Sequence, residues 1–176
     1  NTAINDTYEP GSTFKIVTSS AGLEEKAVSV DDTFVCNGYY IAGDRQIKCW
    51  RYPRTHGQET FVQGVLNSCN PVFMAVAQRL GAETFYNYMV KFGFTQKTGV
   101  DLPGEAVGII HKLENIGPVE LATMSFGQSF QITPLQLLRA ASAIVNGGNL
   151  ITPHFAKAIT DEDGNVIKEF EYPLGE

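Results

Sequence analysis

The stretch Glu9-Pro10-Gly11-Ser12-Thr13-Phe14-Lys15 decides how this chain is interpreted, because it sets a serine at a predicted helix start and a lysine one turn later. Residues three apart share one face of a helix, so the hydroxyl of Ser12 and the amine of Lys15 can meet. The free N–H groups and the positive field of a helix start favour a negatively charged oxygen. The stretch therefore predicts a serine nucleophile, with lysine as its base if burial lowers the lysine pKa.

Ser-x-x-Lys alone is weak support, because two common residues at this spacing recur by chance about once in a chain of this length. The plain alternative is a helix-capping serine and a solvated lysine. A second element, Ser68-Cys69-Asn70, falls at a break between two predicted helices, where a hydroxyl and a carboxamide can both point into a cleft. Serine and asparagine are also ordinary turn residues. Together the two elements indicate acyl transfer through a covalent intermediate.

The remaining chain predicts one helix-rich α/β domain, residues 1–176, in which the Ser12 helix is central and buried. Hydrophobic periodicity and proline positions predict helices over residues 12–26, 60–66, 71–80, 82–92, 118–126 and 134–146. Short β-favouring runs at 33–36 and 46–50 are expected to form a hairpin. A second hairpin is expected from 155–160 and 166–170, joined by Asp161-Glu162-Asp163-Gly164-Asn165.

Composition excludes several classes of function. With 43% hydrophobic residues over 176 positions, the chain can bury one sizeable core. The net charge of -6 and the lack of a basic run argue against a nucleic-acid partner. No apolar run is long enough for a membrane span, so no membrane contact is expected from this segment. We expect no cofactor and no metal, because the cysteines and histidines are dispersed: Cys36, Cys49, Cys69, His56, His111 and His154.

Several stretches resemble one family. Tyr8 to Lys15 resembles the active-serine motif of class B penicillin-binding proteins, and Asn67 to Phe73 resembles their Ser-x-Asn motif. Later landmarks of the family are matched in order by residues 97–105, 126–128, 133–136 and 146–148. The residues of these motifs are most similar to those of the sporulation-specific type of endospore-forming Gram-positive bacteria. The resemblance implies a penicillin-binding-protein/β-lactamase-like transpeptidase fold, here a helix-rich fragment with an incomplete antiparallel sheet.

The resemblance also implies a role for each site residue. Ser12 would attack the D-Ala-D-Ala carbonyl and Lys15 would take its proton. Ser68 would relay a proton to the leaving D-alanine, and Asn70 would hold the substrate amide. The implied activity is that of a peptidoglycan D,D-transpeptidase in spore cortex or septal wall synthesis.

Partners and location follow from the same resemblance. The expected ligands are peptidoglycan stem peptides and β-lactams. The expected protein partners are a glycan polymerase and other cell-wall synthesis proteins. A single-pass anchor outside this segment would hold the catalytic domain on the outer face of the cell membrane.

The tripeptide Lys97-Thr98-Gly99 matches a third family motif but is expected to be a decoy. It lies in a loop, whereas the catalytic Lys-Thr-Gly of the family follows the helix that begins Thr-Pro-Leu-Gln and lies on an edge strand. We therefore expect the chain to stop before the true motif. An isolated fragment would then lack one oxyanion donor and be nearly inactive. A further departure is Ser129, where the family commonly has glycine, which leaves the local backbone conformation open.

Two other functions compete with this interpretation. A serine β-lactamase shares both active-site motifs, but class A enzymes also need a positioned glutamate to activate water. No Glu-x-x-Leu-Asn element occurs between Asn70 and Gly127, and Glu114-Asn115 has the wrong spacing. A non-catalytic penicillin sensor or scaffold is the other alternative. A silent scaffold should lose the nucleophile or base, whereas a sensor would keep all four site residues.

The three cysteines are the last candidates, and the family resemblance places them outside the cytoplasm, where disulfides persist. Cys69 is the middle residue of the Ser-x-Asn motif, and an odd count leaves at least one thiol free in a monomer. Cys36 and Cys49 could pair across the predicted hairpin, or all three could be small buried hydrophobes. Our hypothesis is that Cys49 and Cys69 form a redox-sensitive bridge that clamps the motif.

Overall fold

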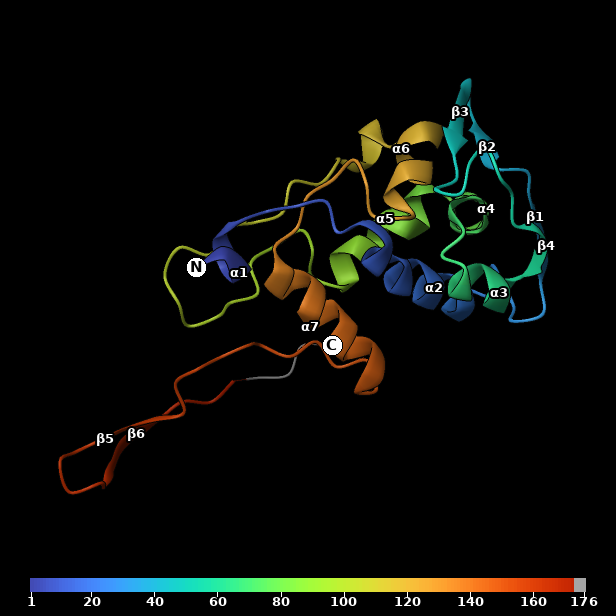
Figure 1. Ribbon diagram of the computed structural model, residues 1–176. Helices are drawn as coiled ribbons and strands as arrows, with labels where there is room; N and C mark the ends of the chain where they lie inside the picture. The colour runs from blue at the N-terminus through green and yellow to red at the C-terminus, as the bar shows by residue number, and fades with distance from the viewer. Residues whose placement is uncertain (173–176) are drawn as a thin grey trace.

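The structure is a computed structural model, and it describes residues 1–172. Helices form the body of the molecule, and short antiparallel strand pairs lie at its edges (Figure 1). The helical elements are α1 (Thr2–Asn5), η1 (Gly11–Phe14), α2 (Lys15–Glu24), α3 (Phe61–Leu66), α4 (Asn70–Leu80), α5 (Ala82–Lys91), η2 (Leu113–Asn115), α6 (Pro118–Met124) and α7 (Pro134–Val145). The predicted helices are present, with ends that differ by a few residues.

Helix α2 is central, as expected, and packs against α4, α5 and α7. The 3₁₀ turn η1 leads into it and carries Phe14, whose side chain is fully buried. The Phe14 ring contacts the rings of Phe85, Phe94 and Phe130 at centroid distances of 6.3, 5.5 and 4.8 Å. Burying a phenylalanine contributes about 1.5–3 kcal/mol. The aromatic core therefore fixes the turn that holds the neighbouring Ser12.

Local side-chain chemistry explains where the helices near the site begin. Thr60 and Gln63 form a reciprocal capping box at the start of α3, and Thr133 and Gln136 do the same for α7. These boxes satisfy N–H groups that a helix start otherwise leaves unpaired. Proline in the first turn of α4, α6 and α7 adds no cost, because that position needs no N–H donor.

The predicted pairing of residues 33–36 with 46–50 is wrong. Strand β1 (Thr33–Cys36) instead pairs with β4 (Gly57–Thr60), and β3 (Arg45–Lys48) pairs with β2 (Tyr39–Ala42). The two-residue connection Gly43-Asp44 makes the tight turn between β2 and β3, with Gly43 at φ +59. Strand β4 falls in a polar stretch that carried no strand signal. Its residues pair with β1 across more than twenty positions of sequence, which local patterns do not reveal.

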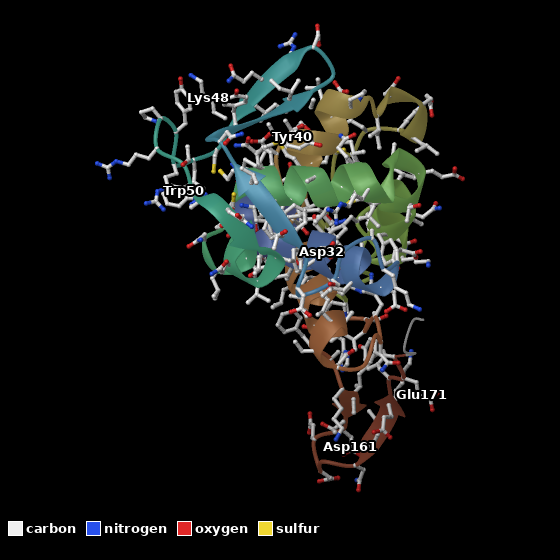
Figure 2. All side chains as sticks on the ribbon, turned by 90° about the vertical axis from the view of Figure 1, so that its right-hand side faces the viewer. Asp32, Tyr40, Lys48, Trp50, Asp161 and Glu171 are labelled. Carbon is white, nitrogen blue, oxygen red and sulfur yellow. The ribbon has the colours of Figure 1, made fainter. Side chains whose placement is uncertain are left out.

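The second predicted hairpin is confirmed, with β5 (Ala158–Thr160) paired to β6 (Val166–Glu169). Its tip carries Asp161, which lies far from the helical body in Figure 2. All three strand pairs of the described residues are antiparallel and two-stranded, which agrees with an α/β fragment with small antiparallel sheets. Within residues 1–172, no helix has both the length and the apolar character needed to cross a membrane.

Candidate active site

Ser12 and Lys15 meet as predicted, at the junction of η1 and α2. The Lys15 Nζ atom lies 3.2 Å from Ser12 Oγ. Phe14 and Val17 anchor this segment in the core, which leaves Ser12 exposed and Lys15 only 5% exposed. The serine can therefore reach a substrate from solvent, whereas the amine is buried beside the Phe73 ring.

The Ser-x-Asn element supplies the other neighbours of the amine. Lys15 Nζ lies 2.8 Å from the carbonyl oxygen of Ser68, 2.9 Å from Ser68 Oγ and 2.7 Å from Asn70 Oδ1. The element lies between α3 and α4, and Asn70 is the first residue of α4. The structure therefore brings three of the predicted catalytic and substrate-binding residues, Ser12, Ser68 and Asn70, around the amine of the fourth, Lys15.

The protonation state of Lys15 decides what this arrangement can do. Burial lowers the pKa of Lys15 from 10.5 to about 8, against an opposing influence from Cys49 and Cys69. A neutral amine has two N–H groups, which suit the two pure acceptors, the Ser68 carbonyl and Asn70 Oδ1. Its lone pair is then free to accept a proton from the hydroxyl of Ser12 or Ser68. The geometry thus fits a general base between two hydroxyl groups.

Ser68 holds an unusual backbone conformation, with φ at +50. Non-glycine residues in the left-handed region are strained and persist only where their surroundings fix them. Here the indole Nε1 of Trp50 donates to the carbonyl oxygens of Asn67 and Ser68, at 3.2 and 3.1 Å. The Asn67 side chain in turn donates to Glu59 Oε2 at 3.0 Å. These contacts fix the carbonyl to which Lys15 donates.

A pocket of about 720 Å³ opens over these groups. It is lined by Gly11, Ser12, Ile47, Lys48, Trp50, Ser68, Asn70, Phe126 and Gln128. Figure 2 shows the labelled Trp50 at the edge of the helical body, beside the β2–β3 hairpin that carries Lys48. A slightly larger cavity, of about 760 Å³, lies against α2, α5 and α7 and contains none of the four site residues. The smaller pocket is the candidate active site.

Trp50, Gln128 and Lys48 were not identified from the sequence as site residues. Trp50 is 63% exposed and follows a short strand, so no periodic pattern marked it. Gln128 lies in the Phe126-Gly127-Gln128 landmark, which the family resemblance had pointed out without a role. Only the folded chain shows that these side chains line the same pocket as Ser12.

Gly127 holds the backbone beside Ser12 through a hydrogen bond to Gly11. The Gly11 N–H donates to the Gly127 carbonyl at 2.8 Å, and Gly127 has φ +82. A Cβ atom at position 127 would lie 2.1 Å from the Gly11 carbonyl oxygen. Only glycine lets the two backbones approach so closely beside Ser12.

The tripeptide Lys97-Thr98-Gly99 lies outside this pocket and outside any strand. Thr98 is 3% exposed and donates both its N–H and its hydroxyl to Oε1 of Glu105. The Gly99 N–H donates to Oε2 of the same carboxylate at 3.2 Å. The tripeptide thus has a structural role in a loop, in agreement with its interpretation as a decoy.

Ser129 adopts the left-handed conformation that glycine would provide, with φ +65. Its N–H donates to Glu9 Oε1 at 2.7 Å, and its hydroxyl lies 2.7 Å from Thr123 Oγ1. The replacement of the usual glycine therefore leaves a glycine-like backbone, which these two contacts hold in place.

The three cysteines, which are dispersed in the sequence, meet in the structure. Cys36, Cys49 and Cys69 are all buried, and none is in a disulfide. Their sulfur atoms and a ring nitrogen of His56 lie within 4.8 Å of one another. Burial and the neighbouring Glu59 side chain raise the pKa of the Cys69 thiol. The fold assembles this cluster from β1, the β3–β4 connection and the start of α4.

Comparisons with known proteins agree with this geometry. The family model described as penicillin binding protein transpeptidase domain matches residues 1–172. Stage V sporulation protein D of Bacillus subtilis is 48% identical over 92% of this chain. Penicillin-binding protein PbpB of Mycobacterium tuberculosis is 32% identical over 96% of this chain. The chain spans about a quarter of the length of these curated relatives, 25% of each.

Solved structures give the same fold. The crystal structure of penicillin binding protein 3 from Mycobacterium tuberculosis in complex with aztreonam superimposes with a TM-score of 0.89 at 31% identity. That match covers 99% of this chain and 39% of the other.

Proposed function

The chain belongs to the penicillin-binding protein transpeptidase family, and on this premise we propose that it carries the acyl-transfer centre of a peptidoglycan D,D-transpeptidase. The observation that carries the proposal is the position of Lys15 Nζ, within hydrogen-bonding distance of Ser12 Oγ, Ser68 Oγ and Asn70 Oδ1. The substrates are peptidoglycan stem peptides that end in D-Ala-D-Ala, and β-lactams are covalent inhibitors that resemble them.

Acylation begins when neutral Lys15 accepts the proton of Ser12. The Ser12 oxygen bonds to the carbonyl carbon of the penultimate D-alanine, and the C–N bond to the terminal D-alanine breaks. Ser68 passes the proton from Lys15 to the departing nitrogen, which leaves a neutral amine base and an ester on Ser12. Asn70 orients the substrate amide beside the pocket.

Deacylation completes the transfer. An amine of a neighbouring stem peptide attacks the ester carbonyl and forms an amide cross-link, the bond between the acyl carbon and the Ser12 oxygen breaks, and the amine proton returns to that oxygen. We further propose that a strand bearing Lys-Thr-Gly, beyond the residues described, supplies the second oxyanion donor. One such donor is worth about 100- to 1,000-fold in rate.

The biological setting is also part of the proposal. The 48% identity to stage V sporulation protein D supports a role in spore cortex or septal wall synthesis. The domain would act on the outer face of the cell membrane with a glycan polymerase and other cell-wall synthesis proteins.

Intact-mass spectrometry after exposure to penicillin tests the proposal. We expect the full-length domain to form a stable adduct with the mass of one penicillin, lost in Ser12→Ala and kept in Ser20→Ala. Ser20 is a matched control, because it is a serine of α2 that donates only to its own helix, to the Ile16 carbonyl. Rapid turnover of the β-lactam without an adduct would support a β-lactamase instead and contradict the proposal.

A further inference from the structure

Four ligand-type side chains converge beside the active site. Cys36 is the last residue of β1, Cys49 follows β3, His56 precedes β4, and Cys69 caps α4. Their donor atoms all lie within 4.8 Å of one another, and His56 Nδ1 lies 3.7 Å from Cys49 Sγ. The exposed fractions of the three cysteines are 0, 2 and 0%. The donors come from three separate segments, because Cys49 and His56 both lie in the β3–β4 connection, so local sequence does not account for the convergence of the whole cluster.

The distances suit a tetrahedral metal ion. Zinc–sulfur bonds of about 2.3 Å place two sulfur ligands about 3.8 Å apart, and a zinc–nitrogen bond of about 2.0 Å places nitrogen about 3.5 Å from sulfur. A cluster within 4.8 Å, with one nitrogen–sulfur distance of 3.7 Å, needs only a small contraction to reach this geometry. Three cysteines and one histidine are a ligand set of structural zinc sites.

One buried polar atom at the cluster supports the presence of a cation. Glu59 lies beside the Cys69 thiol and is 2% exposed, and its Oε1 atom has no hydrogen-bond partner among the described residues. A buried carboxylate oxygen without a partner is costly, and a nearby cation would offset that cost. A disulfide between two of the cysteines would leave this oxygen unexplained.

We propose that Cys36, Cys49, His56 and Cys69 bind one zinc ion that holds the Ser-x-Asn element in its active geometry. Cys69 lies between Ser68 and Asn70, so a metal bond to its sulfur fixes the backbone between two groups that contact Lys15. The His56 ring packs against Trp50 at a centroid distance of 5.5 Å, and Trp50 donates to the Ser68 carbonyl. The ion therefore holds the strained Ser68 in two ways: through its chain neighbour Cys69, and through His56, which packs against Trp50.

Elemental analysis of the purified protein that carries this sequence tests the site. The protein is prepared with a reductant and without chelators, and we expect about one zinc ion per chain. Replacement by Co²⁺ should give the intense visible absorption of a tetrahedral ion and a thiolate-to-cobalt charge-transfer band. These measurements need no variant, so misfolding cannot obscure them.

Two histidine variants provide the matched comparison. His56→Gln should lose most of the bound zinc, whereas His111→Gln should keep it. His111 is also half-buried with an unpaired Nε2 atom, but it lies outside the cluster. Removal of zinc by a chelator should slow penicillin acylation at least tenfold, and added zinc should restore it.

Two results would overturn the proposal. One is reduced protein that neither contains zinc nor takes it up from solution. The other is a Cys49–Cys69 disulfide in protein purified without an oxidant, with no zinc uptake after reduction, which would establish the redox pair in place of the metal. Neither result depends on whether the protein is a transpeptidase.

Discussion

Asn70 Oδ1 lies 2.7 Å from Lys15 Nζ, the shortest of the four contacts that this nitrogen makes with oxygen atoms. The acceptor is a neutral carboxamide, so it orients the amine without adding the negative charge that would hold a proton on it. Under the proposed mechanism, orientation by Asn70 and burial of Lys15 together let the lysine act as a base near neutral pH.

The rate of penicillin acylation should therefore rise with pH and level off above about 8. Lys15 acts in its neutral form, and with a pKa of about 8 about a tenth of the molecules have that form at pH 7. Stopped-flow measurement of adduct formation between pH 6 and 9 checks this. Lys15→Arg, which cannot lose its proton, should be about 100- to 10,000-fold slower. A wild-type rate that is flat or falls over this range would exclude lysine as the base.

Asn70→Asp should move that pH profile upward. A carboxylate at the position of the carboxamide would stabilise the protonated amine, and an opposite charge at such a distance shifts a pKa by about 1–3 units. The midpoint for acylation should rise by at least about one pH unit, with a lower rate at pH 7. Asn115→Asp adds the same charge at an exposed position and should leave the midpoint unchanged. Equal profiles for the two variants would disprove direct contact between Asn70 and Lys15.

Gly127→Ala should reduce both stability and acylation. The new Cβ atom would lie 2.1 Å from the Gly11 carbonyl oxygen, so the turn that carries Ser12 must move. We expect a loss of about 2 kcal/mol or more in unfolding free energy, by urea denaturation. Gly147→Ala is the control, because Gly147 has a similar φ of +87 but its Cβ would approach nothing closer than 3.9 Å. Its cost should be about 1 kcal/mol, and acylation should be unchanged.

How far the sequence predicts the fold depends on the range of each interaction. Helical periodicity and capping residues are local, so α2, α4 and α7 were predicted nearly in full. The pairing of β1 with β4 and the cluster around Cys69 depend on contacts between distant segments, and no spacing rule revealed them. For the site, Ser-x-x-Lys follows from helix geometry alone. The contact between Lys15 and Asn70 required knowledge of how α2 packs on α4.

Ser129→Gly should be tolerated, and comparison with Ser129→Ala isolates the backbone contribution. Both changes remove the contact between Ser129 Oγ and Thr123 Oγ1, but only glycine relieves the strain at φ +65. The glycine variant should be more stable than the alanine variant by about 1 kcal/mol in thermal unfolding. If the alanine variant were the more stable of the two, the left-handed conformation at position 129 would be wrong.

The position of the acyl group tests the central claim most directly, because both Ser12 and Ser68 lie within reach of Lys15 Nζ. After a brief reaction with penicillin, the full-length domain is digested and the modified peptide is fragmented in the mass spectrometer. Our account predicts the adduct on Ser12, with Ser68 unmodified. An adduct on Ser68, or none on either serine in folded protein, would contradict it.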